Sequence, residues 1–201
     1  TSSGNAINIP ATCAACHSYA EYMKGTGLPT TQLAEYRQSV HGKALLEKRE
    51  TSAPSCNDCH GNHGAAPPNV ASISNVCGTC HALNADLFRQ SRHNEEFKRL
   101  GKPECETCHG NHGVKPATLE LLTMDAGAPC ASCHSESKAP EGYRAATTMR
   151  VLLDSLMETV ALAEKRLDAA EQKGMEIDDV RFSLRDARQA RLQSRTAVHA
   201  F

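Results

Sequence analysis

The 201-residue chain contains ten cysteines, and all of them belong to one repeated pattern, Cys-x-x-Cys-His. This pattern attaches a c-type haem: the two thiols add to the haem vinyl groups, and the adjacent histidine binds the iron from one side. The attaching cysteines are Cys13, Cys16, Cys56, Cys59, Cys77, Cys80, Cys105, Cys108, Cys130 and Cys133. The adjacent, proximal histidines are His17, His60, His81, His109 and His134, and they define motifs 1 to 5 in chain order. The sequence therefore predicts five covalently bound haems c.

Two other uses of paired cysteines explain the pattern less well. A zinc site would pair the Cys-x-x-Cys units, and five units leave one unmatched. A redox dithiol needs one motif in a βαβ setting, and the sequence shows no such alternation of strands and helices. Neither use explains a histidine directly after every second cysteine.

The other histidines of the chain equal the motifs in number. They are His41, His63, His93, His112 and His199. One spare histidine per iron is what bis-histidine ligation requires, so we predict that these five fill the distal positions. Methionine is the main competing ligand. The methionines, however, recur at no repeat position; they are Met23, Met124, Met149, Met157 and Met175.

Motifs and spare histidines together form an internal repeat. Each unit holds two motifs, a Ser-x-His element and a histidine three residues after the second motif. The units are residues 13–64, with His41 and His63, and residues 77–113, with His93 and His112. Residues 130–134 begin a third, half unit, whose spare histidine is His199. This repetition suggests duplication of a two-haem module.

His63 and His112 each stand three residues after a proximal histidine, inside the sequence Cys-His-Gly-Asn-His-Gly. So short a tether cannot reach around the porphyrin edge to the opposite face of the same haem. Each of the two histidines is therefore predicted to bind a different haem, and spacing does not say which. Glycines in both elements allow the backbone to turn tightly against a porphyrin; they are Gly61, Gly64, Gly110 and Gly113.

Helices must carry the Ser-x-His elements. The pattern predicts one helix over Thr30–Lys48 with His41 near its middle, and another over Ala85–Leu100 that carries His93 and ends at Gly101. No alternating strand pattern is visible. We therefore expect a mainly α fold with extensive loops, in which residues 1–140 form a multihaem cytochrome c fold wrapped around five haems.

Residues 141–201 have a different character. Apolar residues recur at four and three residues, which indicates one buried stripe on a long helix; they are Met149, Leu153, Leu156, Val160, Ala163, Leu167 and Ala170. Gly174 ends this helix, and Asp178 or Asp179 can cap a second one, with Val180, Leu184, Ala187 and Val198 inward. The prediction is an antiparallel helical hairpin that returns His199 to a haem and offers a surface for self-association.

Composition narrows the class of protein. Aromatic residues make up 4% and tryptophan is absent, a poor apolar supply unless the haems serve as the core. A net charge of −1 provides no basic surface for nucleic acid. No apolar run approaches the ~20 residues that span a bilayer, so no membrane span is expected. No signal peptide is visible either, and Thr1 is expected to follow a signal that has been removed.

These features resemble bacterial multihaem c-type cytochromes, here a pentahaem one. The Cys-x-x-Cys-His-Gly-x-His elements, the Ser-x-His elements and a C-terminal helix that presents a histidine also occur in the nitrite reductase and hydroxylamine oxidoreductase superfamily. The resemblance implies closely packed haems, electron transport as the activity, redox proteins as partners, and a periplasmic or extracellular location outside the bacterial cytoplasmic membrane.

Three functions fit these features to different degrees. The first is an electron carrier rather than an enzyme, because bis-histidine iron has no vacant position for a substrate. The second is a subunit of an extracellular cytochrome filament that conducts electrons between stacked protomers. The third is a reductase of nitrogen or sulfur oxyanions. It requires one open haem, and the Cys-x-x-Cys-Lys motif typical of nitrite reductases of that group is missing.

Overall fold

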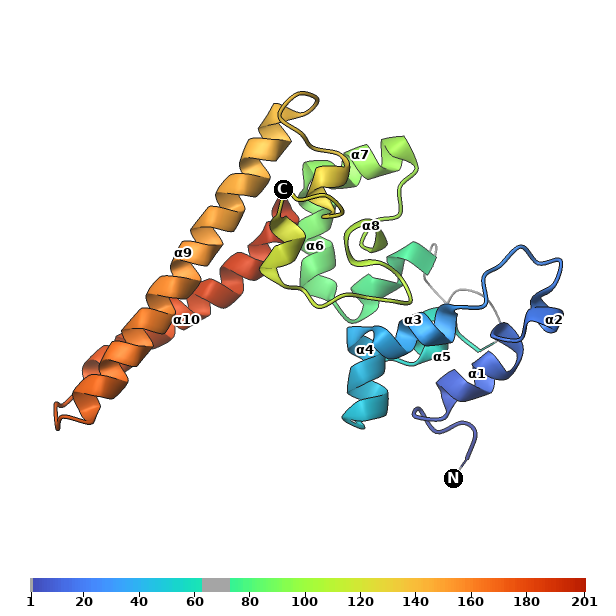
Figure 1. Ribbon diagram of the computed structural model, residues 1–201, viewed down its shortest axis with the longest axis horizontal. Helices are drawn as coiled ribbons and strands as arrows, with labels where there is room; N and C mark the ends of the chain where they lie inside the picture. The colour runs from blue at the N-terminus through green and yellow to red at the C-terminus, as the bar shows by residue number, and fades with distance from the viewer. Residues whose placement is uncertain (1, 63–72) are drawn as a thin grey trace. The chain divides into compact units, whose positions relative to one another are not determined.

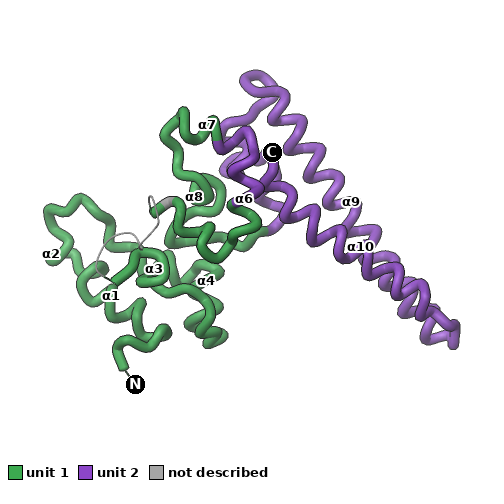
Figure 2. Tube along the Cα trace, turned by 180° about the vertical axis from the view of Figure 1, so that it is seen from behind, with its two compact units in different colours: residues 1–85, 95–117 green, residues 86–94, 118–201 purple. Residues whose placement is uncertain are grey.

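The chain folds into two compact units in the computed structural model, which describes residues 2–62 and 73–201. Unit 1 comprises Thr1–Ala85 and Glu95–Ala117, and unit 2 comprises Asp86–Asn94 and Thr118–Phe201 (Figure 2). The described residues form helices and loops without a strand, which confirms the mainly α fold. A functional boundary at residue 140 stays a prediction, since these units are defined by backbone packing alone.

Unit 1 is built from short helices joined by loops (Figure 1). They are α1 (Ile9–His17), α2 (Ala20–Met23), α3 (Gln32–Gln38), α4 (Val40–Gly42), the π-helical turn η1 (Lys43–Glu47), α5 (Cys56–His60), the 3₁₀ helix η2 (Ile73–Thr79) and α8 (Glu106–His109). Two further helices, α6 (Ala82–Gln90) and α7 (Arg92–Leu100), carry the chain across the boundary between the units.

Both helices predicted around the Ser-x-His elements are interrupted at the serine. The expected helix over Thr30–Lys48 is divided into α3 and α4 at Ser39, whose backbone is extended with ψ 163°. The expected helix over Ala85–Leu100 is divided into α6 and α7 at Ser91 and ends where Gly101 takes a positive φ of 62°. A serine hydroxyl competes with the backbone for hydrogen bonds, so it ends one helix and caps the next.

Unit 2 is dominated by the predicted hairpin. After the 3₁₀ helices η3 (Leu119–Leu122) and η4 (Cys130–Ser132) come α9 (Pro140–Glu171), α10 (Asp178–Ala197) and η5 (Val198–Ala200). The 32 residues of α9 make it about 48 Å long. Gly174 lies between the arms with a φ of 80°.

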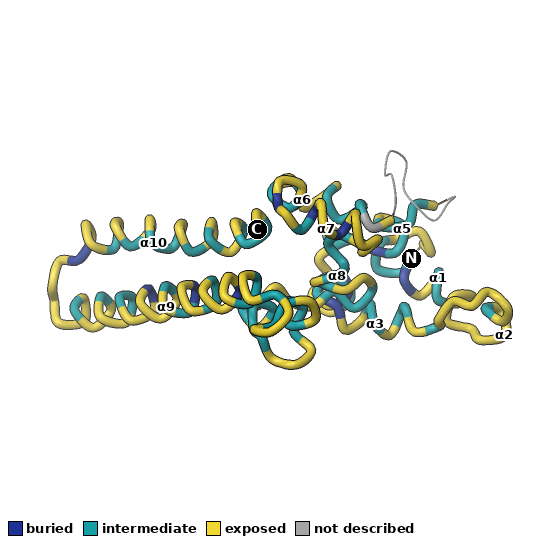
Figure 3. The backbone as a smooth tube through the Cα atoms, turned by 90° about the horizontal axis from the view of Figure 1, so that it is seen from above, coloured by how far each residue is buried: buried dark blue, intermediate teal, exposed yellow. Residues whose placement is uncertain are grey.

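The apolar stripe predicted for α9 is confirmed. Leu153 and Val160 are buried, and the other five stripe residues are half-buried (Figure 3). Ion pairs from α10 to α9 join the arms: Arg181 binds Asp168 and Glu171, and Arg188 binds Glu164 at 2.7 Å.

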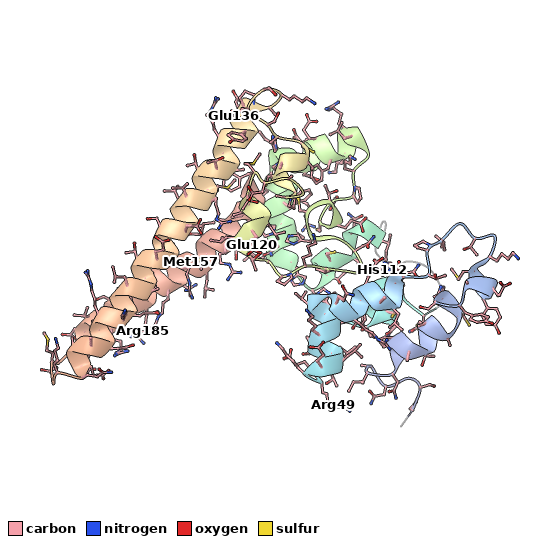
Figure 4. All side chains as sticks on the ribbon, in the orientation of Figure 1. Arg49, His112, Glu120, Glu136, Met157 and Arg185 are labelled. Carbon is pink, nitrogen blue, oxygen red and sulfur yellow. The ribbon has the colours of Figure 1, made fainter. Side chains whose placement is uncertain are left out.

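The prediction that Val180 points inward from α10 was wrong. Val180 is 56% exposed, whereas Ile177, just before the helix, is buried. Arg181 faces α9, and the residue before it is rotated by about 100° around the helix toward solvent. Met157 and Arg185, labelled in Figure 4, are exposed on α9 and α10, and the Arg185 guanidinium lies 3.8 Å above the Phe182 ring.

Few apolar side chains are buried in the described part of the chain. Unit 1 buries Leu45 and Phe97, and unit 2 buries Ala146, Leu153, Val160 and Ile177. None of the described helices has the length and apolar character needed to cross a bilayer. So small a core fits the expectation that large apolar groups complete the interior.

Candidate haem-binding site

Every motif lies on a helical turn. Motifs 1 and 2 occupy α1 and α5, and in motifs 3 to 5 the histidine N–H donates to the carbonyl oxygen of the first cysteine. The N···O distances are 2.9 Å for His81 to Cys77, 3.1 Å for His109 to Cys105 and 2.9 Å for His134 to Cys130. Because residues i and i+3 share a helix face, both sulfurs of a motif can reach one porphyrin.

The turns after motifs 2 and 4 have the same backbone conformation. Gly61 ends α5 with φ 73° and ψ −176°, and Gly110 ends α8 with φ 76° and ψ 176°. Residues other than glycine rarely adopt a backbone conformation with a positive φ of this kind. The sequence repeat is therefore a structural repeat at these glycines, and Gly64 and His63 lie outside the described residues.

The two motifs of each repeat unit lie together in unit 1. Cys13 and Cys56 are neighbours: burial, followed by the nearby Cys13 thiol, raises the pKa of Cys56 to about 11. Cys77 and Cys105 are neighbours as well, and their interaction lowers the pKa of Cys77 to about 7 and raises that of Cys105. Motifs 1 and 2 are thus neighbours, and so are motifs 3 and 4, as a two-haem module requires.

Ser39 and Ser91 present the predicted distal histidines, His41 and His93, in the same way. Each hydroxyl donates to the carbonyl oxygen three residues earlier, at 2.6 Å to Tyr36 and 2.7 Å to Phe88. Each then accepts a backbone N–H three residues later, from Gly42 at 2.9 Å and from Asn94 at 3.4 Å. His41 and His93 thereby occupy the second position of a new helix.

A longer signal in the sequence could have located these breaks. An aromatic residue, arginine and glutamine precede both serines, in residues 36–42 (Tyr-Arg-Gln-Ser-Val-His-Gly) and 88–94 (Phe-Arg-Gln-Ser-Arg-His-Asn). Tyr36 also donates its hydroxyl to the Pro54 carbonyl oxygen at 2.7 Å, next to motif 2. Burial, followed by the nearby Cys56, Cys59 and Asp58, raises the pKa of Tyr36 to about 12, so it remains a donor.

Ser55 is another functional residue that the spacing of cysteines did not indicate. It forms a capping box with Asp58, in which the Ser55 N–H donates to the carboxylate at 2.7 Å, at the start of α5. Ser55 is 1% exposed. The signal was present as Ser-x-x-Asp before the helix, and its effect is to fix the turn that carries Cys56 and Cys59.

In the described part of the chain, three imidazole pairs each join a motif histidine to a spare one. The ring centroids are 6.3 Å apart for His41 and His81, 5.9 Å for His60 and His112, and 5.9 Å for His93 and His134. Imidazole nitrogens bind a metal at about 2 Å, so two rings on opposite sides of one ion have centroids about 6 Å apart. The spacing therefore fits an iron between the rings.

Ordinary aromatic pairs also have centroids about 4.5–7 Å apart, so distance alone does not identify a metal site. The composition of the pairs does more: each contains one histidine of a motif and one spare histidine. Burial, followed by the partner ring, lowers the pKa of His41, His112 and His134. This favours the neutral imidazole, which is the form that binds metals.

The pairs connect different repeat units. His41 of the first repeat unit faces motif 3, and His93 of the second repeat unit faces motif 5. His112, labelled in Figure 4, pairs with His60 of motif 2, in the repeat unit before its own. Motifs 3 and 5, which come first in their repeat units, thus meet a spare histidine from the preceding repeat unit. Motif 2, which comes second in its repeat unit, meets one from the following repeat unit.

Three of the other four predicted ligands lie on separate elements, and the fourth, His63, is outside the described residues. His17 ends α1 and is exposed, His109 ends α8, and His199 lies half-buried on η5. The Nδ1 atom of His199 lies 2.9 Å from the Thr196 carbonyl oxygen. A carbonyl only accepts, so Nδ1 carries the proton and Nε2 is left as the nitrogen that can bind a metal. The pairing of these three histidines stays a prediction.

A metal site built from protein groups alone is not present in the described residues, where no three His, Cys, Asp or Glu side chains come together to hold an ion. All ten cysteines lie in this part of the chain as thiols without a disulfide. Two imidazoles per iron suffice only if other ligands surround the metal in a plane, as a porphyrin's nitrogens do. The donor set therefore fits haem better than zinc.

Comparison with known proteins agrees with this chemistry. Residues 98–139 match the family described as Doubled CXXCH motif. The match supports a multihaem, c-type cytochrome-like protein that binds haem c and its iron covalently and transports electrons. No curated protein and no solved structure matches the chain.

Proposed function

We propose that the chain is an electron carrier with five covalent haems c, each held by a proximal and a distal histidine. The observation that carries this proposal is the composition of the three imidazole pairs, each one motif histidine with one spare histidine at about the spacing of a shared metal. The ligand sets are the ten cysteines and ten histidines predicted above. When bound, haem supplies one-electron chemistry at its iron.

The chain's own residues set where and how that chemistry occurs. Thioether bonds from the two cysteines of a motif would fix a haem to one helical turn. A motif histidine and a spare histidine would hold each iron, which would leave no coordination site for a substrate and favour lower potentials than a Met/His pair. The neighbouring thiols of motifs 1 and 2, and of motifs 3 and 4, bring successive attachment sites together. This arrangement supports electron transfer as the proposed activity.

A filament subunit is the second candidate. Val151, Leu152 and Phe182 on the hairpin are 60%, 64% and 62% exposed, which offers apolar area for contact between copies. Sedimentation over a range of concentrations and electron microscopy test it: ladders or fibres would support a filament, and a monomer at all concentrations would reject it. In either case we propose a periplasmic or extracellular protein with redox proteins as partners.

The test of the carrier function is haem quantification by mass spectrometry, combined with optical and electron paramagnetic resonance (EPR) spectra of the oxidised protein. We expect five haems per chain, all low-spin. A high-spin component of about one haem in five would instead mean an open iron, and would favour the reductase of nitrogen or sulfur oxyanions. A chain that carries zinc, or no haem, would reject both functions.

A further inference from the structure

The His93–His134 pair differs from the other two in the relative orientation of its rings. Its imidazole planes cross at 76°, whereas the planes of His41 and His81 differ by 28° and those of His60 and His112 by 22°. Parallel axial rings split the two iron d orbitals that overlap with them, because both rings act on the same orbital. Crossed rings act on one orbital each and leave the two nearly equal in energy.

The residues that follow the second arm of the hairpin, α10, hold His93. Its Nδ1 atom lies 2.7 Å from the backbone oxygen of Phe201, which follows η5 directly after α10. Because that oxygen only accepts, His93 donates, which fixes the proton on Nδ1 and the rotation of the ring.

The start of the first arm of the hairpin, α9, holds His134. Gly142, in the first turn of α9, presses its backbone against this imidazole: a Cβ there would lie 1.9 Å from Nδ1 and 2.2 Å from Cε1. The Nδ1 atom of His134 is buried without a hydrogen-bond partner in the described part of the chain. Packing against a residue without a side chain, rather than a hydrogen bond, therefore sets the position of this ring.

We propose that the α9–α10 hairpin is a clamp whose two ends hold His93 and His134 crossed, which makes the haem of motif 5 electronically distinct from those served by the near-parallel pairs. Gly142 is a positioning residue in this clamp. The inference rests on the proposed function, because it assumes a bis-histidine haem on motif 5. It adds a structural task for the long hairpin besides returning His199.

Low-temperature EPR of the oxidised, full chain tests the clamp. Near-parallel pairs give rhombic low-spin signals, and a crossed pair gives a separate, highly anisotropic low-spin signal. We expect both kinds. Five haems that are all rhombic would overturn the clamp while leaving the electron carrier intact, whereas missing or high-spin haem would count against the carrier itself.

Gly142→Ala assigns the anisotropic signal. The new Cβ collides with His134, so we expect that signal to shift or vanish while the rhombic signals remain. The matched control is Gly4→Ala, whose Cβ would meet only the Ser2 hydroxyl oxygen at 3.6 Å; its spectrum should equal the parent's. An anisotropic signal unchanged by Gly142→Ala would overturn the proposal.

If Gly142→Ala loses the motif 5 haem by mass, a chain that ends at Ala200 decides instead. It removes the acceptor of His93 and leaves Gly142 untouched. A shifted anisotropic signal with five haems retained would support the clamp, and an unchanged signal would overturn it.

Discussion

In unit 1 and in unit 2 a serine presents a spare histidine with the same hydrogen bonds, but the imidazole pairs that result differ in the angle between their rings. Ser39 and Ser91 make equivalent hydrogen bonds to the residues three before and three after them. In unit 1 the resulting pair, His41 with His81, is nearly parallel. In unit 2 the pair of His93 with His134 is crossed at 76°.

The difference lies in what surrounds the imidazoles. The unit 1 pairs are formed between short helices and loops, whereas both rings of the unit 2 pair touch the ends of a long hairpin, at Gly142 and Phe201. A local sequence motif therefore places a histidine on a helix, and the tertiary neighbours of the ring decide its rotation.

Removal of the distal ligand has the largest expected effect. His41→Ala should keep five haems by mass but convert about one haem in five to high spin, with loss of a rhombic signal, because its iron loses one axial ligand. His93→Ala should open one iron equally and remove the anisotropic signal instead. Lys43→Ala, an exposed neighbour of His41, is the control. A fully low-spin His41→Ala spectrum would show that this histidine does not bind iron.

The residue after each histidine offers the next comparison. A Cβ at Gly42 would lie 1.8 Å from the Tyr36 carbonyl oxygen, so Gly42→Ala should destabilise the chain by about 1–3 kcal/mol. Asn94 is at the equivalent position in the second repeat unit. Asn94→Ala removes the hydrogen bond that the side-chain amide donates to the Arg89 carbonyl oxygen at 2.8 Å, and should lower the free energy of unfolding by about 1 kcal/mol. Guanidinium unfolding measures both values. Equal losses would contradict the difference in packing.

Tyr36 has a hydroxyl where its counterpart in the second repeat is Phe88. Tyr36→Phe should lower the free energy of unfolding by about 1 kcal/mol at neutral pH, through loss of the bond to Pro54. The folded pKa of Tyr36, about 12, is above its ordinary value of 10.0. The hydroxyl's contribution is therefore complete below pH 10 and is lost as pH rises toward 12. A difference between parent and variant that stays constant from pH 9 to 12 would contradict this.

The smallest expected difference is between the losses in free energy of unfolding caused by Ser39→Ala and by Ser91→Ala. Loss of a helix cap costs about 1 kcal/mol. Ser39→Ala should cost somewhat more than Ser91→Ala, because Ser39 accepts from Gly42 at 2.9 Å and Ser91 accepts from Asn94 at 3.4 Å. Urea unfolding compares them, with exposed Ser183→Ala as the control. A larger loss at Ser91 would show that the hydrogen-bond lengths do not rank the two caps.

Local spacing was enough to predict much of the fold. The apolar stripe of α9 lies inward because a period of 3.6 residues identifies one face of a helix. The breaks at Ser39 and Ser91 were not predicted, because each depends on a serine hydroxyl that bonds to the backbone on both sides and so interrupts an otherwise helical pattern. Val180 was misplaced because the rotation of α10 about its axis depends on contacts of Arg181 with the other arm.

The sequence by itself determined which chemistry is available: five Cys-x-x-Cys-His turns, a spare histidine for each, and a repeat of two motifs. Covalent attachment depends on residues within one turn, so adjacency in the chain is sufficient information. Which spare histidine meets which motif was decided only by the tertiary structure, as with His41 and motif 3 or His112 and motif 2. Such contacts join residues far apart in the chain, and the rotation of each ring follows from neighbours that spacing does not encode.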